Sequence, residues 1–78
     1  MRNTFNINDL VVVMEGNAEF PYGSLLTVKE TNTPGLGYYK CVRRDGTGTS
    51  FCEAILKTAS ERELRLWEKG FEIISPSL

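Results

Sequence analysis

Short apolar runs alternate with glycine-rich turns from residue 4 to residue 56. β-Branched and aromatic residues dominate these runs, and such side chains favour the extended backbone of a sheet. Four strands are predicted on this basis, at residues 10–15, 25–30, 38–43 and 49–53. Residues 54–56 are apolar and short, so they predict either a last strand or one turn of 3₁₀ helix.

The pattern changes to that of a helix at residues 60–69. Ser60 and Glu63 have the spacing of a capping box, in which each side chain accepts a hydrogen bond from the other residue's backbone amide. Gly70 is a typical residue for ending a helix. The chain is therefore predicted to be mainly β (α+β), with one C-terminal α-helix.

The predicted helix carries few apolar residues. Leu64 and Trp67 are three positions apart and share one face, which predicts that Trp67 fills the core. Phe71 is expected to fold back onto the same face. Successive residues of a helix are rotated by about 100°, which places Leu66 off the face that Leu64 and Trp67 share. Partial exposure is therefore expected for Leu66.

The third and fourth strands are predicted to form a hairpin. A four-residue loop, 45–48, would place Arg44 opposite Thr49. The pairs that follow outward in this register are Val42 with Phe51, Cys41 with Cys52, and Lys40 with Glu53. The alternation in the third strand leaves two faces open as the buried one, Tyr39 with Cys41 or Tyr38 with Val42.

The length of 78 residues predicts a single domain, assigned to 1–74, with a flexible tail at 75–78. The net charge of −1 means that any phosphate-binding surface is local. The longest apolar run, Leu10–Met14, is too short to span a membrane. The first residues lack the apolar stretch of a signal peptide, so a cytoplasmic protein with no membrane partner is expected.

Residues for catalysis or metal binding are sparse. The chain has no histidine, and Cys41 and Cys52 alone do not make a tetrahedral metal site. A cysteine nucleophile would lack its usual base, and the carboxylates are scattered without the spacing of an acid–base pair. We therefore expect no enzyme activity, no metal and no cofactor, and we expect both cysteines to remain thiols.

Several of these features together resemble the SH3-like small barrels, including the KOW-type modules. The matching features are Phe5-x-Ile7-x-Asp9-x-Val11, Gly23 before Leu25-x-Thr27-Val28, Tyr38-Tyr39-x-x-Val42, the Asp45-Gly46 turn, and Phe51-x-Glu53 with Leu56. The resemblance covers about residues 4–57 and implies a small antiparallel β-barrel, to which this chain adds the helix. The chain also resembles the small accessory proteins of bacteriophages. That likeness implies a binding role, for instance as a modifier of a host protein.

The leading hypothesis is a non-catalytic protein-binding module that acts by steric occlusion of its partner, and the resemblance implies that it is phage-encoded. Its candidate contact residues lie on the first long loop, the hairpin and the helix: Tyr22, Tyr39, Arg43 and Leu66. This hypothesis names no particular partner protein.

Two alternatives stand beside it. The first is nucleic-acid binding, in which cations of the hairpin contact phosphates and a tyrosine stacks on a base; its candidate residues are Tyr38 (or Tyr39), Lys40, Arg43 and Arg44. The second is self-association through an unpaired strand edge such as Leu10–Glu15.

Overall fold

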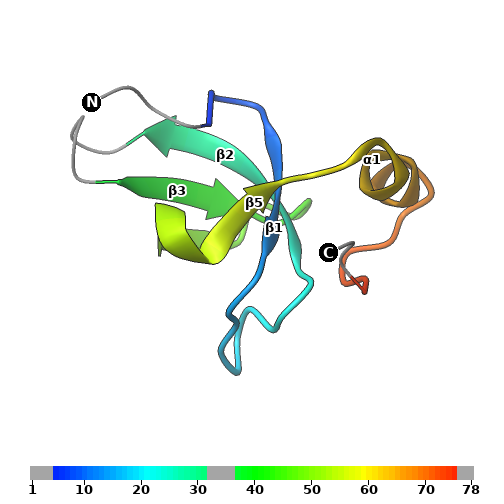
Figure 1. Ribbon diagram of the computed structural model, residues 1–78, viewed down its shortest axis with the longest axis horizontal. Coiled ribbons are helices and arrows are strands. Elements are labelled where there is room, and N and C mark those ends of the chain that lie inside the picture. The colour runs from blue at the N-terminus through cyan, green and yellow to red at the C-terminus, as the bar shows by residue number, and fades with distance from the viewer. Residues whose placement is uncertain (1–4, 32–36, 76–78) are drawn as a thin grey trace.

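The computed structural model describes residues 5–31 and 37–75 of the chain. Five strands and one 3₁₀ turn precede a single α-helix (Figure 1). The elements in chain order are β1 (Leu10–Val13), β2 (Leu25–Thr31), β3 (Tyr38–Val42), β4 (Gly48–Cys52), η1 (Glu53–Ile55), β5 (Leu56–Thr58) and α1 (Glu61–Glu68). The prediction of short strands followed by one C-terminal helix is confirmed, and residues 54–56 take part in both a 3₁₀ turn and a strand. Most of the predicted tail, at 76–78, lies outside the described residues.

All strands belong to one antiparallel sheet with the order β4-β3-β2-β1-β5. Within the described residues β4 and β5 are the two edges and do not pair with each other, so the sheet is open. The hypothesis that Leu10–Glu15 offers an unpaired edge is wrong, because β1 pairs with β2 on one side and β5 on the other. All four residues of β1 are buried, as expected of an interior strand with both faces covered.

The two faces of β1 and β2 are covered by different apolar layers. Val11 and Val13 face the inner cluster, whereas Leu10 and Val12 face the outer cluster. The inner cluster consists of Phe5, Val11, Val13, Phe20, Leu26, Val28, Tyr39, Cys41, Phe51 and Leu56. The outer cluster consists of the buried Leu10, Val12, Leu25 and Ala59, with the half-buried Met14, Trp67 and Ile74 packed against them.

Aromatic rings fill the centre of the inner cluster. Phe5 meets Tyr39 edge to face at 5.1 Å between ring centroids, and Phe20 meets Phe51 in the same way at 5.3 Å. Such edge-to-face pairs are the preferred arrangement of aromatic rings. Tyr39 and Cys41 are therefore the inward-facing pair of β3, which resolves the alternative that the sequence left open.

The predicted register of the β3–β4 hairpin is wrong by three residues. Val42 lies opposite Gly48, and Cys41 lies opposite Thr49. The turn is tighter than predicted: Arg43 N–H donates to the Thr47 carbonyl at 2.8 Å, and Gly46 N–H donates to the Arg43 carbonyl at 2.9 Å. Gly46 has a φ of +93°, as in a three-residue hairpin loop that ends in a glycine bulge.

The same register change corrects the other predicted pairs, because each β3 residue meets a partner nearer the turn. Tyr39 lies opposite Phe51, Lys40 lies opposite Ser50 rather than Glu53, and Tyr38 lies opposite Cys52. The thiol pair and the ion pair expected across the hairpin are therefore absent from this register.

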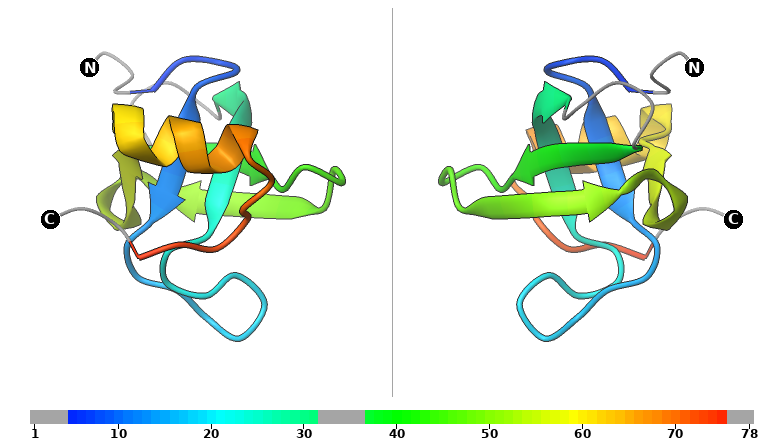
Figure 2. Two further views of the ribbon diagram at one scale, coloured as in Figure 1. Left: turned by 90° about the vertical axis from the view of Figure 1, so that its right-hand side faces the viewer. Right: turned by 90° about the vertical axis from the view of Figure 1, so that its left-hand side faces the viewer.

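Helix α1 crosses the outer face of β1 and β2, on the side opposite to β3 and β4 (Figure 2). The predicted capping box is present: Ser60 N–H donates to Glu63 Oε1 at 2.7 Å, and Glu63 N–H donates to Ser60 Oγ at 3.3 Å. Ala59 N–H donates to the Leu10 carbonyl at 3.0 Å, which ties the start of the helix to the sheet. Glu63 is fully buried, and its carboxylate lies 3.8 Å from Lys57 Nζ.

The predicted apolar face of the helix needs a correction. Leu64 is 44% exposed, and Trp67 is only half-buried at the margin of the outer cluster. Glu63, which serves as the cap, occupies the buried position on the helix. The one buried position of this eight-residue helix is thus taken by a capping residue and not by an apolar one. The helix therefore covers the sheet with few apolar side chains.

Candidate functional site

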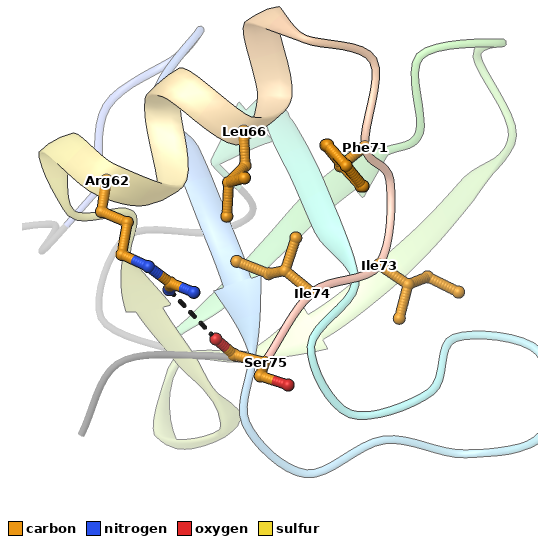
Figure 3. A pocket seen from close by; sticks show the side chains of 6 residues that line it. All are labelled: Arg62, Leu66, Phe71, Ile73, Ile74 and Ser75. Carbon is orange, nitrogen blue, oxygen red and sulfur yellow. Dashed lines mark hydrogen bonds between the residues drawn. The ribbon is translucent and has the colours of Figure 1, made fainter.

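A cavity lies between α1 and the segment that follows it, residues 71–75. We call it the groove; its volume is about 480 Å³ (Figure 3). The residues that line it are Arg62, Leu66, Phe71, Ile73, Ile74 and Ser75. Leu66 and Ile74 point into the space between the helix and the segment, while Arg62 reaches across one end. The groove is therefore apolar along its length and positively charged at one end.

The end of the helix sets one wall of the groove. Gly70 has a φ of +102°, a left-handed conformation that glycine adopts without strain. Gly70 N–H donates to the Trp67 carbonyl at 3.0 Å, and Phe71 N–H donates to the Leu66 carbonyl at 3.1 Å. These two bonds form a Schellman motif, which commonly brings the second residue after the helix close to the last turn. The motif explains why Leu66 and Phe71 line one cavity.

The segment 71–75 forms the opposite wall and is fixed to the sheet by its backbone. Leu25 N–H donates to the Glu72 carbonyl at 2.8 Å, and Ile74 N–H donates to the Gly23 carbonyl at 3.0 Å. These bonds frame an antiparallel bridge between Ser24 and Ile73. The segment therefore continues the sheet beside the start of β2, and the groove has two fixed walls.

Large apolar side chains remain in contact with solvent around the groove. Phe71 is 51% exposed and Ile73 is 52% exposed. As expected, the backbone of Phe71 folds back toward the helix, where its N–H donates to the Leu66 carbonyl. The Phe71 side chain nevertheless remains half exposed to solvent. Exposed large apolar side chains gathered around one cavity make this region a candidate interaction surface.

Arg62 is the one charged side chain among the described residues that line the groove. Its Nη1 donates to the Ser75 carbonyl at 3.3 Å, across the end of the groove. A guanidinium group has five N–H donors, so this single bond leaves most of its hydrogen-bonding capacity available. The end of the groove can therefore bind a carboxylate.

A second, smaller cavity of about 310 Å³ lies beside the β3–β4 turn. Two arginines of this turn contact aromatic rings: the Arg43 guanidinium lies 4.2 Å from the ring centroid of Phe20, and that of Arg44 lies 3.8 Å from that of Trp67. Each also donates to a backbone carbonyl, Arg43 to that of Glu19 and Arg44 to that of Trp67. The turn thus bridges the first long loop and the helix.

The four predicted protein-contact residues occupy different places. Leu66 lines the groove, and Tyr22 is 48% exposed on the first long loop. Arg43 covers the Phe20 ring. Tyr39 is 1% exposed in the inner cluster, where its hydroxyl donates to Glu53 Oε1 at 2.9 Å. The prediction that Tyr39 contacts a partner is therefore wrong. Alternate residues of β3 point to opposite faces, and it is Tyr39 that points into the core while Tyr38 points to solvent.

The predicted nucleic-acid residues do not gather on one surface. Tyr38 and Lys40 are exposed and project from the same face of β3, since alternate residues of a strand share a face. Arg43 and Arg44 extend from the turn to two different parts of the chain, the first long loop and the helix. Lys29 was not among the predicted nucleic-acid-binding residues, but it lies with the two arginines around the smaller cavity.

The two cysteines differ in environment. Cys41 is buried, and burial raises the pKa of its thiol from 9.0 to about 12. Cys52 is exposed on β4. Because neither lies opposite the other in the hairpin, the predicted pairing of the two thiols is wrong.

Within residues 5–31 and 37–75, no group of three or more Cys, Asp or Glu residues could hold a metal ion. No helix of the described chain is long and apolar enough to cross a membrane. No family model, curated protein or solved structure matches this chain. The groove and its surroundings therefore provide the basis for a functional conclusion.

Proposed function

We propose that this chain is a non-catalytic protein-binding module whose contact surface is the groove. The observation that carries the proposal is the exposed apolar side chains of Phe71 and Ile73 beside a cavity of about 480 Å³ with two fixed walls. In a protein interface, a few side chains that become fully buried in well-packed pockets supply most of the binding energy. Leu66, predicted from the sequence as a contact residue, lies at the centre of this surface.

The scaffold in this proposal is an SH3-like small barrel, as the sequence resemblance implies. Its support is the antiparallel sheet whose inner face encloses an aromatic core, followed by a helix on the outer face. The resemblance to bacteriophage accessory proteins extends the proposal to a cytoplasmic modulator that occludes a surface of a host protein. Steric occlusion of this kind requires binding alone.

The test is capture from an extract of the native host on immobilised protein, with a matched pair of variants. Phe71→Ala removes a half-exposed ring from the groove, and Tyr38→Ala removes a similarly exposed ring from β3. We expect one protein to be retained stoichiometrically by the wild type and by Tyr38→Ala. Phe71→Ala should weaken its binding by about tenfold or more, the usual effect of losing an interface anchor.

Two results would overturn the proposal: no protein is retained by the wild type, or Phe71→Ala retains it as well as Tyr38→Ala does. Thermal unfolding of both variants provides the control for folding. Because both rings are about half exposed, we expect both variants to remain folded.

A second candidate function, nucleic-acid binding, is favoured by the three cations around the smaller cavity, Lys29, Arg43 and Arg44. Nucleic-acid binding is the secondary candidate because Arg43 and Arg44 already contact aromatic rings and backbone carbonyls. Binding to single- or double-stranded DNA or RNA should then weaken steeply as salt rises, because phosphate contacts release counterions. Binding that is absent, or that does not change with salt, eliminates this candidate.

A further inference from the structure

We infer that the groove takes a linear segment of a partner protein in which bulky apolar side chains stand next to an aspartate or glutamate. The inference rests on the proposed function and specifies the chemistry of the partner. It follows from three properties of the groove: its size, the position of its one charge, and the rigidity of its walls.

The size of the groove fits a short segment. A volume of about 480 Å³ lies in the lower half of the range of about 300–1,000 Å³ typical of ligand pockets. Its apolar lining comes from Leu66, Phe71, Ile73 and Ile74, without a polar side chain between them. A few apolar side chains of an extended or helical segment can bury themselves there, in the manner of peptide-binding grooves.

The charge at the end of the groove selects an acidic neighbour. Among the described arginines, three already contact a ring or a carboxylate: Arg43 and Arg44 lie over rings, and Arg65 pairs with Glu61 at 2.8 Å. Within residues 5–31 and 37–75, the Arg62 side chain bonds to the Ser75 carbonyl alone. A carboxylate can accept two parallel N–H bonds from a guanidinium group, and such charge-assisted bonds are the stronger kind.

A second cation stands at the end of the helix, outside the residues that line the groove. Arg62, Leu66 and the C-cap residue Lys69 stand four and three positions apart, so they follow one face of the helix. Lys69 is exposed. A segment that lies along Leu66 therefore has a cation near each end, and an acidic segment matches this pattern better than a basic one.

The walls need no rearrangement to receive the segment. The Schellman bonds of Gly70 and Phe71 fix the helix side, and the bridge between Ser24 and Ile73 fixes the other. The bond from Arg62 to Ser75 holds the guanidinium at the end of the groove. A preformed site lowers the entropy cost of ordering that binding would otherwise carry.

The test uses a random library of twelve-residue peptides displayed through their C termini, so that a carboxylate can come only from a side chain. The library is selected on the wild-type protein. We expect enriched peptides with at least two bulky apolar residues and an Asp or Glu within a few positions of them. Peptides that bind the groove should lose affinity on Phe71→Ala.

Two matched variants then test the role of Arg62 with one enriched synthetic peptide. Arg62→Ala should weaken binding by at least about fivefold, whereas Arg65→Ala should leave it unchanged because Arg65 is paired with Glu61. Replacing the acidic residue of the peptide by its amide should cause a similar loss. That loss should disappear when it is measured on Arg62→Ala, since the two groups contact each other.

The inference is overturned if the enriched peptides lack acidic residues, or if Arg62→Ala and Arg65→Ala weaken peptide binding equally. It is also overturned if no peptide is enriched and the protein forms a homodimer that the Phe71→Ala substitution dissociates. Acid-free peptides that still lose affinity on Phe71→Ala overturn the inference and leave the proposed function standing. Failure of the host-extract capture overturns the proposed function itself.

Discussion

The inner and outer clusters lie on the two faces of the same strands, yet they are built differently. The inner cluster has ten buried residues, and its rings meet in edge-to-face pairs. The outer cluster has four buried residues and is completed by side chains that are only half-buried, among them Trp67 and Ile74. One layer packs on the inner face of the sheet together with Phe5 and Phe20 from outside the strands, and the other is covered by a short helix and the segment after it.

The difference separates stability from binding. The inner layer excludes water from nearly all of its side chains, so it provides most of the hydrophobic stabilisation. On the outer face, the helix buries the carboxylate of Glu63, and Phe71 and Ile73 remain half exposed. Incomplete cover on one face therefore leaves apolar surface exposed while the core behind it stays closed, and the proposed partner would bind to this surface.

The largest expected effect comes from the inner cluster. Phe51→Ala removes a 3% exposed ring that packs on Phe20, and such core truncations cost about 3–5 kcal/mol. For a domain of this size that loss is a large part of the free energy of unfolding. Urea unfolding should show it as a large fall in the transition midpoint, or as a protein that does not fold. Phe71→Ala is the matched ring in the groove, and a loss there as large as that of Phe51→Ala would contradict the comparison.

The buried cap of the helix should have the next largest effect. Glu63→Ala removes an acceptor for Ser60 N–H and the partner of Lys57, so we expect a loss of about 1–3 kcal/mol. The control is Glu61→Ala, which breaks only an exposed pair with Arg65 and should cost about 0–0.5 kcal/mol. Urea unfolding of the two variants measures the difference, and equal losses would show that the helix contributes little through its cap.

The turn at Gly70 should have a smaller effect on stability and a clear effect on the groove. Gly70→Ala forces a φ near +102° on a residue with a Cβ, at a cost of about 1–2 kcal/mol. Nothing lies within 4 Å of that Cβ, so the cost comes from the backbone and not from a clash. Lys69→Ala, the adjacent control, should be close to neutral in stability. The measurement combines urea unfolding with peptide affinity, and unchanged affinity for Gly70→Ala would show that the Schellman turn does not shape the groove.

The smallest effect concerns the thiols. Cys52 should react with a thiol reagent at pH 8 in the native protein, while the buried Cys41 reacts only after unfolding. Because the folded state holds the Cys41 proton more tightly, its pKa of about 12 makes stability fall as pH rises above 9.0. Cys41→Ala should reduce this alkaline loss when the free energy of unfolding is measured between pH 8 and pH 10. Reaction of both thiols at equal rates would contradict the buried position of Cys41.

Local signals predicted the fold where one residue type determines the conformation. Ser60 with Glu63 predicted the helix start, and Gly70 predicted its end. The hairpin register depended on whether Gly46 or Gly48 carried the left-handed conformation, and both glycines lie in the same five residues. Only the hydrogen bonds of the folded turn distinguish them, so the predicted register was wrong.

The groove was only partly visible in the sequence. Leu66 was recognised because it lies off the Leu64 face, but Ile73 and Ile74 were not included among the contact residues. Their position depends on the backbone bridge to Ser24, a contact between distant parts of the chain. The available signal was three apolar residues within four positions directly after a helix-ending glycine.

The most direct test of the account is to map the contact surface of the captured partner by backbone amide chemical shifts of the labelled protein. We predict that the largest changes fall on residues 62–75, with small changes in β3 and β4. Changes centred on Tyr38–Val42 and the turn that follows, with residues 62–75 unaffected, would contradict the assignment of binding to the outer face.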